Sequence, residues 1–278
     1  MKVAIIGLGL IGGSLARSIK LHSAYEVYGI DLSEETMRQA ELMEAIDRRL
    51  TEDNLGECEM VLIATYPQAI VDWLAENSAR IAPDALVIDC GGVKRWIVER
   101  AQAIAQGQRW HFLGGHPMAG REYSGFRYSR DNLFERASMI LTPTGEEELP
   151  LLQRAKDFFL DIGFRRVVFT TPEEHDEMIA YTSQLAHVLS GAYVNSPLAG
   201  KHKGFSAGSF ADLTRVARVG EGLWSELFLD NRDQLLASLD VLIANLNEYR
   251  KALSEGDRER LMAVIRRGRE MKESLDEA

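Results

Sequence analysis

The chain has 278 residues, of which 46% are hydrophobic and 27% are charged, and its formal net charge at pH 7 is −10. This composition is that of a globular protein, and the length suffices for two domains of about 100–200 residues each. The acidic balance argues against nucleic acid or an anionic membrane surface as partner, since both attract basic proteins.

The spacing of the cysteines and the pattern at the N-terminus exclude further classes of protein. Cys58 and Cys90 are the only cysteines, and they lack the paired spacing of a zinc site or a disulfide framework. A strand pattern follows Met1 directly, where a signal peptide would show a basic segment, and no apolar run reaches the roughly 20 residues of a membrane span. We therefore expect a cytoplasmic protein with no metal ion and no membrane partner.

The first 20 residues have the pattern strand, glycine turn, helix. An apolar run at residues 2–6 passes into GLGLIG at residues 7–12 and then into a helical pattern. A GxGxxG turn in this setting is typical of a dinucleotide site, because its glycines allow a tight turn, approach of a pyrophosphate and close helix packing. A purely structural turn is the alternative. The residues predicted to bind the cofactor here are Gly7, Leu8, Gly9, Leu10, Ile11 and Gly12.

Asp31 ends a second predicted strand at residues 25–30. It lies about 20 residues past the last glycine of the turn, where a carboxylate binds the adenosine ribose hydroxyls and repels the 2′-phosphate of NADP. We therefore predict NAD as the cofactor. The alternative is that Asp31 caps the helix that begins near Ser33.

Further apolar strands are predicted at residues 60–64, 85–89 and 110–113, with helical segments between them. Alternating strands and helices predict a doubly wound, Rossmann-type parallel sheet, whose ligands bind beyond the carboxyl ends of the strands. Thr65, Gly91 and Lys94 follow two of these strands, so we assign them to the cofactor side. Two more strands, at residues 138–141 and 166–169, flank a helix at residues 151–161 that Gly163 closes.

The segment GGHPMAG at residues 114–120 is predicted to form a sharp turn leaving a buried strand. Its glycines would let backbone and ligand approach, and Pro117 would stiffen the loop that carries His116. An imidazole held in this way can move a proton. The alternative is a packed histidine with satisfied hydrogen bonds.

From Thr171 onward the pattern becomes helical. Thr171-Pro172-Glu173-Glu174 is a capping box with proline at the first helical position. The helix that follows has two faces that could both be buried, and further helices are predicted at residues 210–219, 224–247 and 257–278. We predict a dinucleotide-binding domain over residues 1–171 and an all-helical substrate and dimerisation domain over residues 172–278, which forms a homodimer.

Polar residues of the helical half supply candidate ligands for a substrate. Asp212 and Arg215 are three residues apart on a predicted helix and can pair, and an arginine fork binds a carboxylate bidentately. A solvated helix pair is the alternative. A single histidine such as His187 is more often a satisfied core histidine, but its place beside Ser183 on a small, polar helix stripe also makes it a candidate ligand.

These motifs together resemble the prephenate/arogenate dehydrogenase family over nearly the whole chain. The resemblance rests on GLGLIGGSLA at residues 7–16, residues 89–94, GGHPMAGREYSG at residues 114–125, SQLAH at residues 183–187 and ADLTRVA at residues 211–217. It implies NAD-dependent oxidative decarboxylation of prephenate to 4-hydroxyphenylpyruvate, or of arogenate to tyrosine. Hydride would pass from C4 of this small dicarboxylate to NAD, and the helical half would form the dimer.

Carried over residue by residue, the resemblance makes His116 the catalytic base and Glu122 an acidic gate or network residue. Ser183 and His187 become substrate-pocket residues, and Asp212 with Arg215 an ion-paired arginine site. Where the family often has a serine that orients the histidine this chain has Gly92, so Ser124 or a water is expected to replace it.

Other departures concern substrate preference. Residues 183–187 read SQLAH where the family has SHLPH, and Ala211 stands in place of a basic residue. We expect a monofunctional enzyme, with no chorismate mutase segment before the first strand and no ACT-like domain after the last helix. Two alternatives are a 3-hydroxyacid or imino-acid oxidoreductase, which would not need His116, and a non-catalytic NAD-sensing protein.

Overall fold

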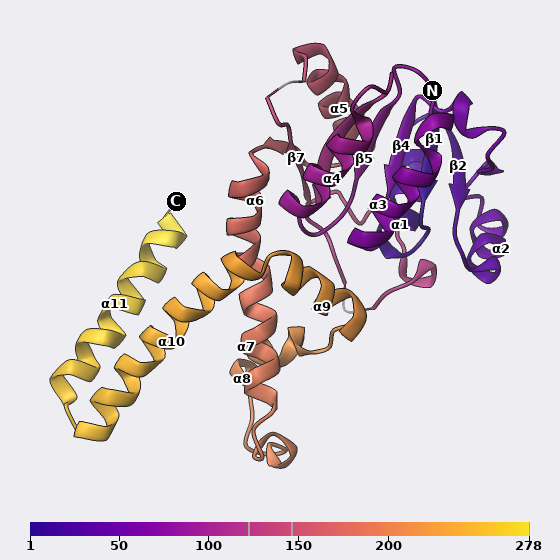
Figure 1. Cartoon of the computed structure of the whole chain (residues 1–278). Helices are drawn as coiled ribbons and strands as arrows, with labels where there is room; N and C mark the ends of the chain where they lie inside the picture. Colours follow the sequence, from indigo (N-terminus) through magenta and orange to yellow (C-terminus); the bar gives the residue numbers. More distant parts are fainter. Residues whose placement is uncertain (122, 146, 278) are drawn as a thin grey trace. The chain divides into compact units, whose positions relative to one another are not determined.

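The computed structural model describes all residues except Glu122, Glu146 and Ala278, and it forms two compact units, Met1–Asn231 and Arg232–Ala278 (Figure 1). The strands are β1 Lys2–Ile6, β2 Glu26–Ile30, β3 Arg48–Arg49, β4 Met60–Ile63, β5 Leu86–Asp89, β6 His111–Pro117, β7 Ser138–Thr142 and β8 Arg166–Phe169. The α-helices of the first unit are α1 Leu10–His22, α2 Glu34–Leu42, α3 Pro67–Asn77, α4 Arg95–Ala105, α5 Leu149–Asp161, α6 Pro172–Ile179, α7 Leu185–Val194, α8 Gly208–Thr214 and α9 Glu221–Asp230. Those of the second unit are α10 Arg232–Glu255 and α11 Arg258–Glu277.

The strands form one sheet in the order β3-β2-β1-β4-β5-β6-β7-β8. All neighbouring pairs are parallel except β6 and β7, which run antiparallel with His116 opposite Ile140. The predicted doubly wound Rossmann-type fold is therefore confirmed. The two-residue strand β3, made of Arg48 and Arg49, has no apolar run and was not predicted.

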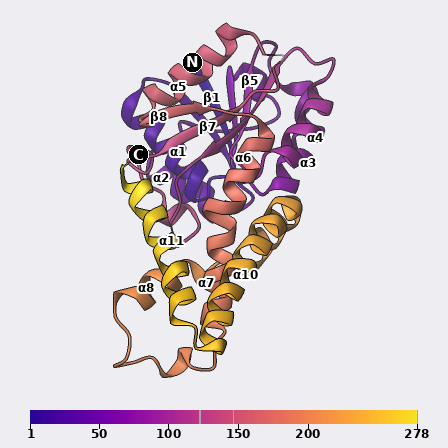
Figure 2. The ribbon, with the colours of Figure 1, turned by 90° about the vertical axis from the view of Figure 1, so that its left-hand side faces the viewer.

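Helices cover both faces of this sheet, as Figure 2 shows from the side. Helices α1, α2 and α5 bury apolar side chains against one face, and α3 and α4 against the other. The central strands β4 and β5 are buried along their whole length, which explains why their sequences are continuously apolar. Their carboxyl ends, at Ile63 and Asp89, lie at one edge of the sheet.

The predicted sharp turn at Gly114 is wrong, because β6 continues through Gly114 and Gly115 to Pro117. The two glycines serve close packing within the sheet. A Cβ on Gly114 would lie 2.2 Å from Thr142 Oγ1, and one on Gly115 would lie 2.6 Å from the carbonyl oxygen of Asp89. His116 is thus held on a sheet strand rather than on a loop.

Thr171 caps α6 as predicted, since its hydroxyl accepts a hydrogen bond from the amide of Glu174 at 3.1 Å. The long helix expected after it is interrupted by a π-helical turn at Ala180–Gln184 before α7 begins. Figure 1 shows α6 and α7 following one another away from the sheet. A π-helical turn inserts a residue into the helical repeat and frequently marks a functional site.

The single helix predicted over residues 224–247 is also wrong, because it breaks at Asn231 between α9 and α10. Asn231 is fully buried and leaves the helical conformation. Its amide nitrogen donates to the carbonyl oxygen of Asp176 and to Gln184 Oε1, and its oxygen accepts from Arg95. These three hydrogen bonds hold the end of α9 against α6 and α4.

In the second unit α10 and α11 form a helical hairpin, turned at Gly256, which has a positive φ of 66°. Arg267 pairs with Glu248 across the hairpin. Many large apolar side chains of the two helices are exposed in the single chain, among them Leu236, Val241, Leu246, Leu253, Met262 and Ile265. Within the described part of the chain, no helix is both long and apolar enough to cross a membrane.

Candidate active site

The glycines of the first turn differ in what surrounds them. Gly7 has a φ of 84°, and a Cβ on Gly12 would lie 1.8 Å from the carbonyl oxygen of Gly7. A Cβ on Gly9, by contrast, would meet nothing within 4 Å. Gly7 therefore allows the tight turn, and Gly12 allows α1 to pack closely against it. The backbone at Gly9 is left accessible.

The N-terminus of α1 at this turn has no side-chain cap. The amides of Leu10, Ile11 and Gly12 have no acceptor within the helix, as in any first turn, and the helix dipole favours an anion there. The buried hydroxyl of Thr65, at the end of β4, has no hydrogen-bond partner among the described residues. An open backbone, uncapped amides and an unpartnered hydroxyl fit a dinucleotide phosphate.

Asp31 contacts the same turn. One carboxylate oxygen accepts a hydrogen bond from the amide of Leu8 at 2.8 Å and the other from the amide of Ser33 at 2.9 Å. The helix cap of α2 is Ser33 itself, whose hydroxyl accepts from the amide of Thr36. The structure therefore does not support the alternative that Asp31 caps α2.

Lys94 was predicted to contact the cofactor, and its side chain is fully buried. Its ammonium group pairs with the equally buried Asp89 and donates to the carbonyl oxygen of Gly115 at 2.6 Å. Asp89 also accepts from the amides of Gly91 and Gly115, at 2.9 and 3.1 Å. This buried pair ties β5 to the strand that carries His116, so Lys94 positions the site.

His116 belongs to a chain of three hydrogen-bonded side chains. Its Nδ1 lies 2.9 Å from Nε2 of His175, and Nδ1 of His175 lies 2.8 Å from Oδ1 of Asp176. Asp176 is fully buried and also accepts from the backbone amides of Lys94 and Arg95, at 2.7 and 2.9 Å. The carboxylate therefore sits at the N-terminus of α4, where the helix dipole favours a negative charge.

These partners determine which ring nitrogens carry protons. Burial would raise the pKa of Asp176, but the hydrogen bonds from His175 and from the amides of α4 hold it below its ordinary value. An ionised Asp176 accepts only, so His175 carries its proton on Nδ1, and burial keeps the pKa of His175 below its ordinary value. His116 then donates from Nδ1 to His175, which leaves the lone pair of His116 on Nε2.

His116 is itself kept neutral. Burial lowers the pKa of His116 well below its ordinary value, followed by the positive charge that His175 carries once it is protonated and by the charge of Lys94. A neutral imidazole with a defined lone pair on Nε2 is a competent proton acceptor near pH 7.

A cavity of about 780 Å³ adjoins His116, which is a size typical of sites for small molecules. It is lined by Gly92, the segment from His116 to Arg121, Tyr123, residues of the π-helical turn, His187, and the segment that follows α8. Ser183, His187 and Arg215 all line it, so the structure brings these three predicted residues together with His116.

His187 is fixed within this wall. Its ring lies 3.7 Å from that of Trp224, measured between centroids, and its Nδ1 is 2.7 Å from the carbonyl oxygen of Val216. Nδ1 must therefore be the donor, and Nε2 carries the lone pair. Burial, with a smaller contribution from the charge of Arg215, lowers the pKa of His187 and favours the neutral ring.

The outcome differs for three other predicted site residues, Ser124, Asp212 and Glu122. Ser124 is exposed, does not line the cavity and has no hydrogen bond to His116 among the described residues, so it does not replace the family serine. Asp212 and Arg215 form no ion pair in the described part of the chain, and Asp212 is not among the lining residues. Glu122 lies outside the described residues.

His175 and Asp176 were not predicted from the sequence. The dipeptide stands in the first turns of a capped helix, where a polar pair is ordinarily taken as solvated surface. Burial of both side chains depends on α6 packing against the N-terminus of α4. The sequence held one indication of this burial. The helix directly follows β8, a strand of the same sheet, so its first turns start close to the sheet.

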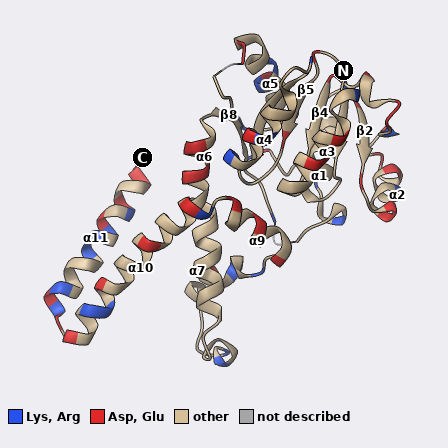
Figure 3. Ribbon diagram, viewed as in Figure 1, with Lys and Arg blue, Asp and Glu red and all other residues tan. Residues whose placement is uncertain are grey.

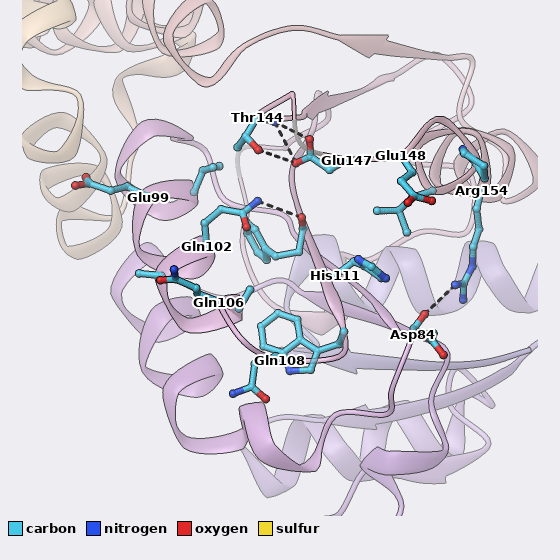
Figure 4. Close-up of a pocket in the computed structure, with 17 residues that line it drawn as sticks. Asp84, Glu99, Gln102, Gln106, Gln108, His111, Thr144, Glu147, Glu148 and Arg154 are labelled. Carbon is cyan, nitrogen blue, oxygen red and sulfur yellow. Dashed lines mark hydrogen bonds between the residues drawn. The ribbon is translucent and has the colours of Figure 1, made fainter.

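A second cavity, of about 920 Å³, lies between α4 and α5 and has the opposite electrostatic character (Figure 4). Asp84, Glu99, Glu147 and Glu148 line it, and the one lining arginine, Arg154, donates to the carbonyl oxygens of Asp84 and Glu59. An anionic substrate is not expected there. No three metal-ligating side chains come together in the parts of the chain that the structure describes.

Comparisons with known proteins agree with this arrangement. The prephenate dehydrogenase nucleotide-binding domain matches residues 15–168, and the prephenate dehydrogenase dimerization domain matches residues 171–267. Prephenate dehydrogenase of Bacillus subtilis (strain 168) is 30% identical over 282 residues, which cover 98% of this chain and 76% of that protein.

Two solved structures are similar over almost the whole chain. Prephenate dehydrogenase from A. aeolicus, in complex with hydroxyphenyl propionate and NAD+, is 28% identical with a TM-score of 0.88 and covers 99% of this chain and 98% of its own. Synechocystis arogenate dehydrogenase is 25% identical with a TM-score of 0.83 and covers 99% of this chain and 100% of its own. Because both domain matches and the full-length similarity agree with the geometry around His116, this chain belongs to the prephenate/arogenate dehydrogenase family.

Proposed function

We propose that this chain catalyses NAD-dependent oxidative decarboxylation of a prephenate-type substrate, a cyclohexadiene with a C4 hydroxyl, a ring carboxylate and a side-chain carboxylate. The observation that carries the proposal is the Asp176–His175–His116 chain, which ends in a lone pair on Nε2 of a histidine that lines the substrate-sized cavity. A non-catalytic NAD-sensing protein would have no use for this chain of hydrogen bonds.

His116 is proposed to act as the general base. Its Nε2 takes the proton of the C4 hydroxyl as the C4 hydrogen departs as hydride, so a carbonyl forms at C4. The bond from the ring to its carboxylate then breaks, and its electron pair makes the ring aromatic with release of CO₂. The phenolate oxygen takes the proton back from His116, which returns the base to its starting state.

Asp176 and His175 are positioning residues in this scheme. They hold the ring of His116 in one orientation and one tautomer, and the negative charge of Asp176 stabilises the imidazolium that forms during proton transfer. The role that the family assigns to a serine at the position of Gly92 is filled here by His175, which occupies Nδ1 of His116.

NAD is the cofactor, and when bound it accepts the hydride. The residues proposed to hold it are the open backbone at Gly9, the amides of the first turn of α1, Asp31 for the ribose hydroxyls, and the hydroxyl of Thr65. Gly91, whose amide donates a hydrogen bond to Asp89 at 2.9 Å, is proposed to belong to the same site.

Substrate carboxylates are proposed to bind at the far wall of the cavity. Arg215 is exposed there and can form a bidentate, charge-assisted contact with a carboxylate. Ser183 and the Nε2 of His187 offer further polar contacts from the helical wall. Holding the carboxylate fixes C4 relative to His116, and such positioning lowers the activation barrier.

The direct test is absorbance at 340 nm when prephenate or arogenate is added to the protein with NAD. We expect NADH to form together with 4-hydroxyphenylpyruvate or tyrosine. If neither substrate yields NADH while NAD binds, the proposed reaction is wrong.

We also propose that the protein is a homodimer that works in the cytoplasm, with a dinucleotide-binding domain at residues 1–171 and a helical domain at residues 172–278. The match of residues 171–267 to a dimerization domain supports the dimer. So do the exposed apolar side chains of α10 and α11, since patches of this kind commonly mark protein interfaces.

A further inference from the structure

Three arginines line the cavity beside His116, namely Arg121, Arg215 and Arg218. They come from two different parts of the chain, because Arg121 follows β6 and the other two follow α8. All three are exposed, and among the described residues none of them has an ion-pair or hydrogen-bond partner for its guanidinium group. The cavity thus holds three cationic side chains, and no side chain in the described part of the chain is paired with any of them.

This charge is unusual for the molecule. The chain has 42 acidic and 32 basic residues, and Figure 3 marks acidic residues in red along α2, α6 and α9. Yet no aspartate or glutamate occurs among the described residues that line the cavity. Glu226 on α9 is engaged elsewhere, since it accepts a hydrogen bond from the amide of Gln68 at 2.6 Å.

We propose that Arg121 and Arg218 act with Arg215 to select the dianionic keto acid, prephenate, over the corresponding amino acid, arogenate. This inference rests on the proposed function. The two molecules share both carboxylates and differ in the side chain, where arogenate carries an ammonium group in place of the keto oxygen. One has a net charge of −2 and the other of −1.

The positive charges of the cavity act in opposite ways on the carboxylate and ammonium groups. Each guanidinium attracts a carboxylate and repels an ammonium group at a similar distance, because both interactions obey the same Coulomb law. An ammonium group would need an anionic or strongly accepting partner, and the described lining offers only hydroxyl, carbonyl, amide and imidazole acceptors such as Nε2 of His187. Such neutral acceptors do not offset three positive charges, so binding of the amino acid is disfavoured.

Arg121 and Arg218 are distinct from Arg215 in what they are expected to do. Arg215 binds a carboxylate that both substrates possess, so its loss weakens both. Arg218 and Arg121 are assigned to the side-chain end of the substrate, so their loss weakens the binding of prephenate and relieves the repulsion of arogenate. The ratio of the two kcat/KM values therefore separates the two roles.

The test compares kcat/KM for prephenate and arogenate, with NAD saturating, in the wild type and in Arg218→Gln, Arg121→Gln and Arg215→Gln. We expect the wild type to prefer prephenate by about 100-fold or more, and each of the first two variants to lose about 10-fold of that preference. Arg109→Gln is the matched control, because Arg109 precedes the opposite end of β6 and does not line the cavity. It should leave both values within about 2-fold of wild type.

Reversing the charge of Arg218 gives a more stringent test. Arg218→Glu should raise kcat/KM for arogenate while lowering it for prephenate, and a gain of this kind cannot result from misfolding. Equal kcat/KM for the two substrates in the wild type, or an unchanged ratio in Arg218→Gln and Arg121→Gln, overturns the inference. A loss of NAD affinity with equal effects on both substrates in Arg121→Gln also overturns it for that residue, and assigns Arg121 to the cofactor.

Binding of prephenate and arogenate, measured by calorimetry, tests this inference independently of the proposed reaction. Selective binding of prephenate without NADH formation overturns the reaction and supports the inference. Oxidation of both substrates with equal efficiency supports the reaction and overturns the inference. Binding of neither overturns both.

Discussion

Nδ1 of His116 and Nε2 of His175 lie 2.9 Å apart, although the two residues are 59 positions apart in the chain. The contact joins a strand of the sheet to the helix that follows β8, and Asp176 anchors it on the N-terminus of α4. Each prediction about the chemistry of this site depends on that contact or on the glycine turn beside it.

Replacement of His116 by asparagine keeps a hydrogen-bonding side chain of similar size but removes the base. We expect kcat to fall by about 10²–10⁴-fold while the dissociation constant for NAD is unchanged. Both values should be measured on a variant whose circular dichroism matches that of the wild type. Near-normal kcat would assign the base to another group, with His187 the next candidate.

The pH profile tests the same base without a mutation. Because burial lowers the pKa of His116, the neutral, active form persists to lower pH than for an ordinary histidine. The value of kcat/KM should fall only as pH drops through the lowered pKa, so that less than half of the activity is lost at about pH 6.5. An acid limb centred above that pH would contradict the neutral, buried assignment.

His175→Leu should lower kcat by on the order of 10–10²-fold with little change in KM, because leucine has no acceptor for Nδ1 of His116 and the tautomer of His116 is no longer fixed. A purely structural role would not move the acid limb. Here the limb should shift to higher pH, since the positive charge that His175 gains as the pH falls is one of the causes that keep the pKa of His116 low.

Gly92→Ser is the control for this prediction. A Cβ at Gly92 would lie 3.2 Å from the end of the Leu227 side chain, which can move by a few tenths of an ångström. We expect this variant to keep kcat within about 3-fold of wild type, because His116 is already oriented from the other side. A large gain in kcat would mean that the serine position, rather than His175, limits the orientation of His116.

The glycine turn offers a matched pair of variants. Gly9→Ala should leave the thermal unfolding temperature unchanged and raise the dissociation constant for NAD, because its Cβ points into open space that the cofactor would occupy. Gly12→Ala should lower the unfolding temperature as well, since its Cβ would collide with the backbone of Gly7. If Gly9→Ala binds NAD normally, the pyrophosphate does not pass over this turn.

Asp31 should make the enzyme prefer NAD to NADP. In Asp31→Asn the oxygen that accepts from the amide of Leu8 can be kept, while the negative charge that repels a 2′-phosphate is lost. We therefore expect the ratio of kcat/KM for NAD to that for NADP to fall by about 10-fold or more in the variant. Equal use of the two cofactors by the wild type would limit Asp31 to its contact with the turn.

The proposed homodimer is tested by light scattering at micromolar concentration. We expect twice the mass of the 31.1 kDa chain. Replacing Leu246 and Leu253 with glutamate, on the exposed apolar side chains of α10, should yield the monomer. A strictly monomeric wild type would contradict the assignment.

Much of the nucleotide-binding half could be predicted because its signals are local. A strand that runs into GxGxxG, an aspartate at the end of the next strand and a capping box at Thr171 each depend on a few neighbouring residues. The structure shows the corresponding elements at β1, α1, β2 and α6.

The parts that failed depend on distant packing. The close packing of Gly114 and Gly115 within a strand could not be predicted from the sequence, because the atoms they would collide with belong to α4, β5 and β7. Nor could the sequence show that Lys94 turns inward to Asp89, or that Asn231 breaks a helix to bond with α6 and α4. The pairing of His116 with His175 likewise requires the whole sheet to be assembled.

The π-helical turn at Ala180–Gln184 makes the active site sensitive to the number of residues as well as to their identity. One residue advances an α-helix by about 100° of rotation. Deleting a single residue within this turn would restore an ordinary helical repeat and swing His187, with everything after it, about a quarter of a turn away from the cavity. A relative that lost one codon here could therefore keep every side chain discussed above and still be unable to assemble them around a substrate.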